Sequence, residues 1–154
     1  MIRATLVRCA SEISSDRVID RVVLDADERH RRRITLTGER GTTFLLDLPH
    51  ATALRDGDGL VLEDGSIVRV AGKPEALVEI MATSPQELAR LAWHIGNRHT
   101  DVQIVGDKLR IRRDHVLEEM LHGLGARLTP IEAPFDPEHG AYGHGDEHHH
   151  PYDE

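Results

Sequence analysis

SPQELARLAWHIGNRH, residues 84–99, is the stretch that decides the fold of this chain. Ser84 followed by Pro85 is typical of a helix start, because serine caps the first turn and proline fits the first helical position. Glu87 stands where a capping box has its acidic residue. Apolar residues then recur at helical spacing, at Leu88, Leu91, Ala92 and Ile95. Gly96 and Asn97 tolerate the left-handed conformation of a helix C-cap, so we predict a helix that ends there.

The segments around this helix predict the rest of the second domain. ALVEIMAT, residues 76–83, has the composition of a strand, and VQIVGDKLRIRR, residues 102–113, predicts a hairpin that turns at Gly106 and Asp107. Asp114 caps a second helix within HVLEEMLHGLG, and ARLTPIEAPF, residues 126–135, is the last strand. The order strand, helix, strand, strand, helix, strand predicts a ferredoxin-like domain, with two helices on one face of a four-stranded antiparallel sheet.

The first half of the chain reads as short strands. Asp64 and Gly65 separate two apolar runs, which is a strong hairpin signal. Regular short strands with glycine turns favour an all-β small barrel or sandwich. We therefore predict an α+β protein with an all-β domain at 1–73, a ferredoxin-like domain at 74–135 and a disordered histidine-rich tail at 136–154. AGKPEA, residues 71–76, is the expected boundary between the two domains.

Charge and composition exclude several classes of protein. The chain carries 27 acidic and 19 basic residues, for a net charge of −8, which argues against a nucleic-acid partner. No stretch approaches the roughly 20 apolar residues of a membrane span, and the start lacks the apolar core of a signal peptide, so we expect a cytoplasmic protein without a membrane partner. Cys9, the single cysteine, is expected to be a small buried residue of the first strand.

Histidine is the unusual component of the composition. The chain has 11 histidines, and the last sixteen residues hold five of them, His139, His144, His148, His149 and His150. Imidazole is a good ligand for nickel, copper and zinc, so the tail is expected to capture metal, although a polar tail can also simply keep a protein soluble. The sequence contains no His-Glu-x-x-His, phosphate-loop or Gly-x-Ser-x-Gly motif.

Four of these stretches together resemble one family. WHIGNRH at 93–99, the following VQI, DHVLEEMLHGLG and PFDPEHGAYGHG with its histidine-rich end are similar to the UreE family of urease accessory proteins. The resemblance implies a nickel metallochaperone and not an enzyme. It implies a homodimer, formed through the ferredoxin-like domain, that hands Ni²⁺ to apo-urease in an assembly with the accessory proteins UreD, UreF and the GTPase UreG.

The same resemblance implies the metal ligands. His99, which ends the Gly-Asn-Arg-His motif, corresponds to the key ligand of the family, and the tail histidines named above add binding capacity. In a two-fold dimer a residue near the axis meets its own copy, so His99 would be present twice at one ion. Cu²⁺ and Zn²⁺ are expected to bind the same imidazoles in vitro. Some family members carry extra histidines just before the Asp-His-Val motif, where this chain has Arg112 and Arg113.

The residues also leave other interpretations open. His99 alone could be a surface histidine that caps helix carbonyls. A metal-dependent hydrolase could use His94 and His99, although a third fixed ligand is missing nearby. A folding helper could carry the tail incidentally, with the β-rich first domain binding an extended client strand. The basic run at 29–33 (RHRRR) could dock an acidic partner surface, such as that of urease or its accessory complex. His94 is expected to be structural, and His30 and His50 are expected to be isolated surface residues.

Overall fold

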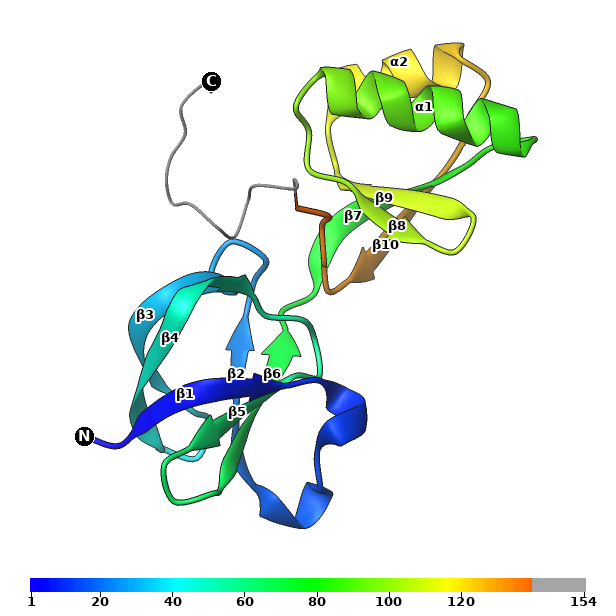
Figure 1. Ribbon diagram of the computed structural model, residues 1–154. Helices are drawn as coiled ribbons and strands as arrows, with labels where there is room; N and C mark the ends of the chain where they lie inside the picture. Colours follow the sequence, from blue (N-terminus) through cyan, green and yellow to red (C-terminus); the bar gives the residue numbers. More distant parts are fainter. Residues whose placement is uncertain (140–154) are drawn as a thin grey trace. The chain divides into compact units, whose positions relative to one another are not determined.

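The computed structural model describes residues 1–139 and divides them into two compact units (Figure 1). The first unit comprises Met1–Lys73, with His139 grouped to it, and the second comprises Pro74–Glu138. Among the described residues, no helix has both the length and the apolar character needed to cross a bilayer.

The first unit is one six-stranded sheet that curls around a single core (Figure 1). Its elements are β1 (Arg3–Arg8), the 3-10 turns η1 (Ala10–Glu12) and η2 (Ser15–Arg17), β2 (Val18–Leu24), β3 (His30–Thr37), β4 (Thr43–Ala53), β5 (Gly59–Leu62) and β6 (Ile67–Gly72). The strand order is β2-β6-β5-β1-β4-β3. The pairs β1/β4 and β2/β6 are parallel, and the other pairs are antiparallel. The predicted all-β first domain is therefore confirmed.

A buried carboxylate organises one turn of this sheet. Asp20 is 4% exposed and accepts hydrogen bonds from the backbone N–H groups of Arg21, Arg40 and Thr42. Burial by itself would raise the pKa of Asp20, but these hydrogen bonds and the Thr42 side chain lower it to about 2. Gly38 is required beside it, because a Cβ there would lie 2.3 Å from a carboxylate oxygen of Asp20.

The second unit has the predicted ferredoxin-like fold. Its elements are β7 (Glu75–Met81), α1 (Pro85–Asn97), β8 (Gln103–Val105), β9 (Lys108–Arg112), α2 (His115–Gly123) and β10 (Arg127–Ala133). The sheet is antiparallel throughout in the order β10-β7-β9-β8, and both helices cover one of its faces (Figure 1). One apolar core joins them, and it includes Val78, Ile80, Leu91, Ile95, Leu109, Ile111, Leu117 and Leu121.

Both helices begin at the predicted caps. The side chain of Ser84 accepts a hydrogen bond from the N–H of Glu87 at 3.1 Å, and that of Asp114 accepts one from Leu117 at 2.9 Å. Each cap satisfies an N–H group that has no partner within the helix. The carboxylate of Glu87 lies 3.0 Å from Arg90 in an ion pair.

Two segments differ from the sequence expectations. Cys9 is exposed, because β1 ends at Arg8 and the cysteine begins the η1 turn, so its predicted burial is wrong. The second unit also continues to Glu138, past the boundary expected at residue 135. The reason is that Asp136 and Glu138 donate backbone hydrogen bonds to Gln103 and Val102, and are thereby held to the domain.

Candidate metal site

The predicted ligand His99 lies at the end of α1, in a main-chain motif that closes the helix. The N–H of His99 donates to the carbonyl of Gly96 at 3.0 Å, and that of Thr100 donates to Ile95 at 3.4 Å. This pair of bonds is the Schellman motif, which requires a left-handed residue just past the C-cap. Here that residue is His99, with φ of 57°, and among the described residues it is the one non-glycine with positive φ. The helix continues through Gly96 and Asn97, so the expected left-handed positions were two or three residues too early.

The imidazole of His99 has no polar or aromatic partner within the described part of the chain. The residue is exposed, and its side chain makes no hydrogen bond, ion pair or ring contact with any described residue. The carbonyls of Ile95 and Gly96 accept backbone N–H groups, and the His99 ring bonds to no helix carbonyl, so the interpretation of His99 as a side-chain cap is wrong. Both ring nitrogens are therefore accessible to a ligand, whereas the backbone beneath them is fixed.

The loop that follows His99 is fixed from two sides. The carboxylate of Asp101 lies 3.1 Å from the guanidinium of Arg112, which also pairs with Glu75 at 3.1 Å. The carbonyl of Val102 accepts the N–H of Glu138 at 2.7 Å. Because these partners lie on β7, β9 and the segment after β10, the loop is held by the whole sheet.

The two arginines before α2 are occupied by ion pairs. Arg112 is engaged as just described, and Arg113 donates two hydrogen bonds to Glu118, at 3.0 and 3.1 Å. The hydrogen bond from Arg113 lowers the pKa of Glu118, and the same contact raises the pKa of Arg113. A guanidinium stays protonated and cannot ligate a cation, so these two positions stabilise the domain and supply no metal ligand.

The remaining histidines are dispersed over the structure. His94 is half-buried and its ring meets Trp93 edge-on at 5.1 Å, in agreement with a structural role. His115 is exposed and lies 3.6 Å from Glu119. The ring of His30 lies 4.6 Å from that of His139, so the expectation that His30 is isolated is wrong. The other four predicted tail ligands, His144, His148, His149 and His150, lie outside the described residues.

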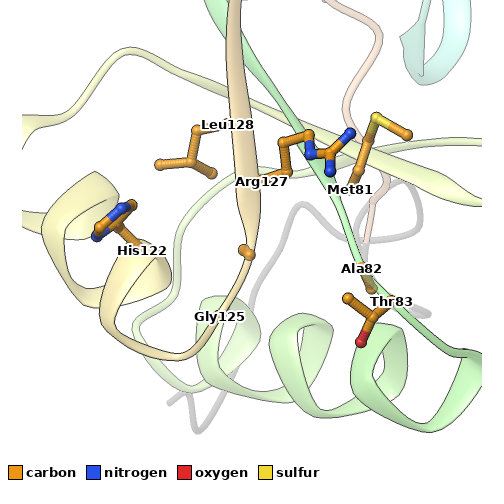
Figure 2. Close-up of a pocket in the computed structure, with 8 residues that line it drawn as sticks. Met81, Ala82, Thr83, His122, Gly125, Arg127 and Leu128 are labelled. Carbon is orange, nitrogen blue, oxygen red and sulfur yellow. The ribbon is translucent and has the colours of Figure 1, made fainter.

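His99 belongs neither to a cluster of metal-binding side chains nor to the cavity described next. Residues 1–139 contain no group of three or more His, Cys, Asp or Glu side chains arranged to hold a metal. A cavity of about 670 Å³ is lined by Met81, Ala82, Thr83, His122, Gly125, Ala126, Arg127 and Leu128. Its lining comes from the end of β7 and the residues after it, the end of α2 and the start of β10 (Figure 2). Thr83 precedes α1 and His99 follows it, and a helix of 13 residues is about 20 Å long. The cavity and His99 are therefore at opposite ends of α1.

Exposed apolar side chains mark the helical layer and were not anticipated from the sequence. Trp93 on α1 is 64% exposed and Val116 on α2 is 63% exposed. Leu91 and Ile95, which flank Trp93 in the chain, are completely buried. The helical period predicts this contrast, because position 93 lies off the stripe formed by 88, 91, 92 and 95. Trp is enriched at protein interfaces relative to the rest of the surface.

These features define a class: a two-domain α+β protein that presents the imidazole of His99 at its surface, on a fixed helix end, and not in an enclosed pocket. Two family models match the chain, the UreE urease accessory protein N-terminal domain over residues 7–72 and the C-terminal domain over residues 75–154. The chain belongs to the UreE family of urease accessory proteins.

Individual relatives agree with this membership. The urease accessory protein UreE of Rhodopseudomonas palustris (strain BisB18) is 59% identical over 142 residues, which cover 92% of this chain and 67% of the relative. The protein of the same name from Bradyrhizobium sp. (strain BTAi1 / ATCC BAA-1182) is also 59% identical, covering 92% and 68%. That of Chelativorans sp. (strain BNC1) is 50% identical, covering 92% and 87%.

Proposed function

We propose that this protein is a nickel carrier that binds Ni²⁺ through His99 and delivers it to apo-urease, without catalytic turnover of its own. Family membership supports a role in the maturation of urease. The observation that best supports the nickel assignment is the free imidazole of His99. The backbone of His99 is in the left-handed region, which costs a non-glycine residue about 1–2 kcal/mol. A residue retained at that cost, with its side chain unused by the fold, is a candidate for function.

A homodimer completes the proposed site. One imidazole cannot hold Ni²⁺ against water, whereas a two-fold axis near the end of α1 brings a second His99 to the same ion. The exposed apolar side chains of Trp93 and Val116 support a contact between the helical layers of two copies. The tail supplies the remaining ligands in this proposal, from His139, His144, His148, His149 and His150, and a tail ligand that orders on binding is readily released.

The proposed partners follow from the family. We propose that delivery involves the urease apoprotein and the accessory proteins UreD, UreF and the GTPase UreG, in the cytoplasm. The first unit is the proposed docking domain: Arg31, Arg32 and Arg33 are exposed on β3, an edge strand of the curled sheet. Arg29 does not belong to this surface, because it is 2% exposed and its guanidinium donates to the carbonyls of Leu24 and Leu54.

Calorimetric titration with Ni²⁺ tests the proposal in the wild type and in three variants. We expect His99→Ala to lose the tightest site, at one ion per dimer, and a chain ending at Glu138 to lose the additional weaker sites. His122→Ala is the matched control, because it removes an exposed histidine near the end of the other helix. Light scattering on the nickel-loaded protein should give the mass of a dimer.

Four results would contradict the proposal. Equal nickel binding by His99→Ala and the wild type would exclude His99 as the main ligand, and a nickel-loaded monomer would exclude the axial site. Hydrolytic turnover that depends on the bound ion would favour the enzyme alternative. Protons compete with nickel for imidazole nitrogens, whose reference pKa is about 6.5. The affinity for Ni²⁺ should therefore fall below roughly pH 6. A nickel affinity that stays constant to pH 5 would indicate carboxylate ligands.

A further inference from the structure

The segment after β10 folds back onto the sheet face that the helices leave open. Phe135 is completely buried although it lies outside every strand, and the guanidinium of Arg112 stands 4.9 Å from the centre of its ring. On β9, Leu109 and Ile111 belong to the core under the helices, so the alternation of a strand puts Arg112 on the other face. Leu77 pairs with Arg112 across the ladder and is also completely buried there. Phe135 is therefore the apolar anchor of this second face.

Two backbone hydrogen bonds extend the anchor toward the loop after His99. The N–H of Asp136 donates to the side-chain oxygen of Gln103 at 3.1 Å, and the N–H of Glu138 donates to the carbonyl of Val102 at 2.7 Å. Figure 1 shows the chain turning back beside the sheet once β10 has ended. We call residues 134–138 the strap. It begins at the end of β10 and ends against the residues that lead into β8.

We propose that the strap fixes the origin of the histidine-rich tail beside His99, with Phe135 and Gln103 as positioning residues for metal binding. The expected effect on metal binding rests on the proposed nickel function, whereas the position of the strap rests on contacts within the second unit alone. Val102, to which Glu138 is bonded, is three positions from His99 in the chain, so the two Cα atoms are at most about 11 Å apart.

The length of chain between the strap and a tail histidine gives an estimate of how far the strap favours tail-assisted metal binding. His144 is six positions beyond Glu138 in the sequence, and a flexible linker of six residues would span about 13 Å on average. An intramolecular ligand is most effective when its linker length matches the distance to the site, so an origin next to Val102 favours a short linker. Without the strap the free segment would start after Ala133, eleven positions before His144. Effective concentration falls with about the 3/2 power of linker length, so release would weaken tail-assisted binding by about threefold or more.

Energy transfer from Trp93, the single tryptophan, tests the geometry without any metal. The acceptor is a dansyl group on the thiol introduced by Ala141→Cys, in a chain that also carries Cys9→Ser so that no second thiol is labelled. This chain is mixed with an excess of unlabelled protein so that each dimer carries one label. Gln103→Ala combined with Glu138→Pro removes both strap hydrogen bonds and should lower the transfer efficiency. Phe135→Ala should lower it further, and Phe135→Leu, which keeps an apolar anchor, should restore it. Circular dichroism verifies that each variant is folded.

Nickel titration of the unlabelled variants tests the consequence. The Gln103→Ala, Glu138→Pro chain should bind Ni²⁺ about threefold more weakly than the wild type, whereas the same pair of changes in a chain ending at Glu138 should have no effect on affinity. Unchanged energy transfer would overturn the strap as the origin of the tail. Lowered transfer with unchanged nickel affinity would overturn its positioning role. Loss of nickel binding in the wild type itself would overturn the proposed function and leave the transfer result standing.

Discussion

The two helices of the second unit end in the same hydrogen-bonded motif, but they place different residues at its left-handed position. At the end of α2, Gly125 donates to His122 at 3.0 Å and Ala126 donates to Leu121 at 3.1 Å, with φ of 95° at the glycine. At the end of α1 the same two bonds form, and His99 occupies the left-handed position with φ of 57°.

This difference separates what the fold needs from what function adds. Glycine reaches the left-handed region without steric cost, so Gly125 is the residue that the motif alone would select. Histidine has no such advantage and contributes no side-chain contact with the described residues to offset the strain. The helix end of α2 is therefore a structural control, built into the same domain, for the helix end of α1.

The largest expected effect is on metal binding by His99→Gly. This change keeps the left-handed backbone and removes the imidazole, so we expect loss of the tightest Ni²⁺ site with an intact helix end. Calorimetry measures the site, and the far-ultraviolet circular dichroism should match that of the wild type. Tight binding retained by the glycine variant would show that the difference between the two helix ends has no connection with nickel.

Next in size is the reciprocal change, Gly125→His. A Cβ at position 125 meets no atom within 4 Å, so any penalty comes from the backbone conformation and not from crowding. We expect a loss of about 1–3 kcal/mol in the free energy of unfolding. Urea denaturation measures it, with Gly123→Ala inside α2 as the control, because position 123 has ordinary helical φ and equally open space. A neutral Gly125→His would mean that histidine is tolerated at such positions without strain.

A smaller effect of opposite sign is expected for the stability of His99→Gly. Relief of the left-handed strain is partly offset by the greater flexibility of glycine in the unfolded chain, so the expected gain is about 0.5–1 kcal/mol. Thermal unfolding of metal-free protein should show a rise of a few degrees in Tm. A metal-free variant less stable than the wild type would indicate that the His99 side chain stabilises the fold.

The smallest expected effect is on the free energy of unfolding, through the ion pair between Arg113 and Glu118 at the start of α2. The pKa of Glu118 is lowered by Arg113, so this contact stabilises the fold above the ordinary carboxyl pKa and is lost as the pH falls through the lowered value. Because Arg113 is half exposed, we expect Glu118→Gln to cost under about 1 kcal/mol at pH 7 and less at pH 3. Urea denaturation at both pH values measures this, with the exposed Glu119→Gln as control, and an equal cost at pH 3 would exclude the ion pair as its cause.

The order of elements in the second unit could be predicted because its signals are local. Ser84 and Asp114 cap the helices as expected, and the turn predicted at Gly106 has positive φ there. The first unit was predicted only as all-β, because the parallel pairing of β1 with β4 joins segments about forty residues apart, which no local pattern encodes.

The features that sequence reasoning missed have a common cause. Gly96 and Asn97 have the higher intrinsic preference for the left-handed conformation, but the buried stripe that ends with Ile95 keeps the helix regular through Asn97. Phe135 was assigned to a strand, and its role on the open face depends on Arg112 and Leu77, which are remote in sequence. In both cases tertiary packing decided the conformation.

The closed end of α1 has a kinetic consequence. Because the His99 ring takes no part in the hydrogen bonds that close the helix, it could bind or release an ion without breaking any bond that holds the domain together. An ion bound there would leave at a speed set by exchange of its own ligands, and not by the much slower opening of secondary structure. Transfer to a recipient would then depend on which competing ligands arrive, so the recipient's chemistry would control the timing of release.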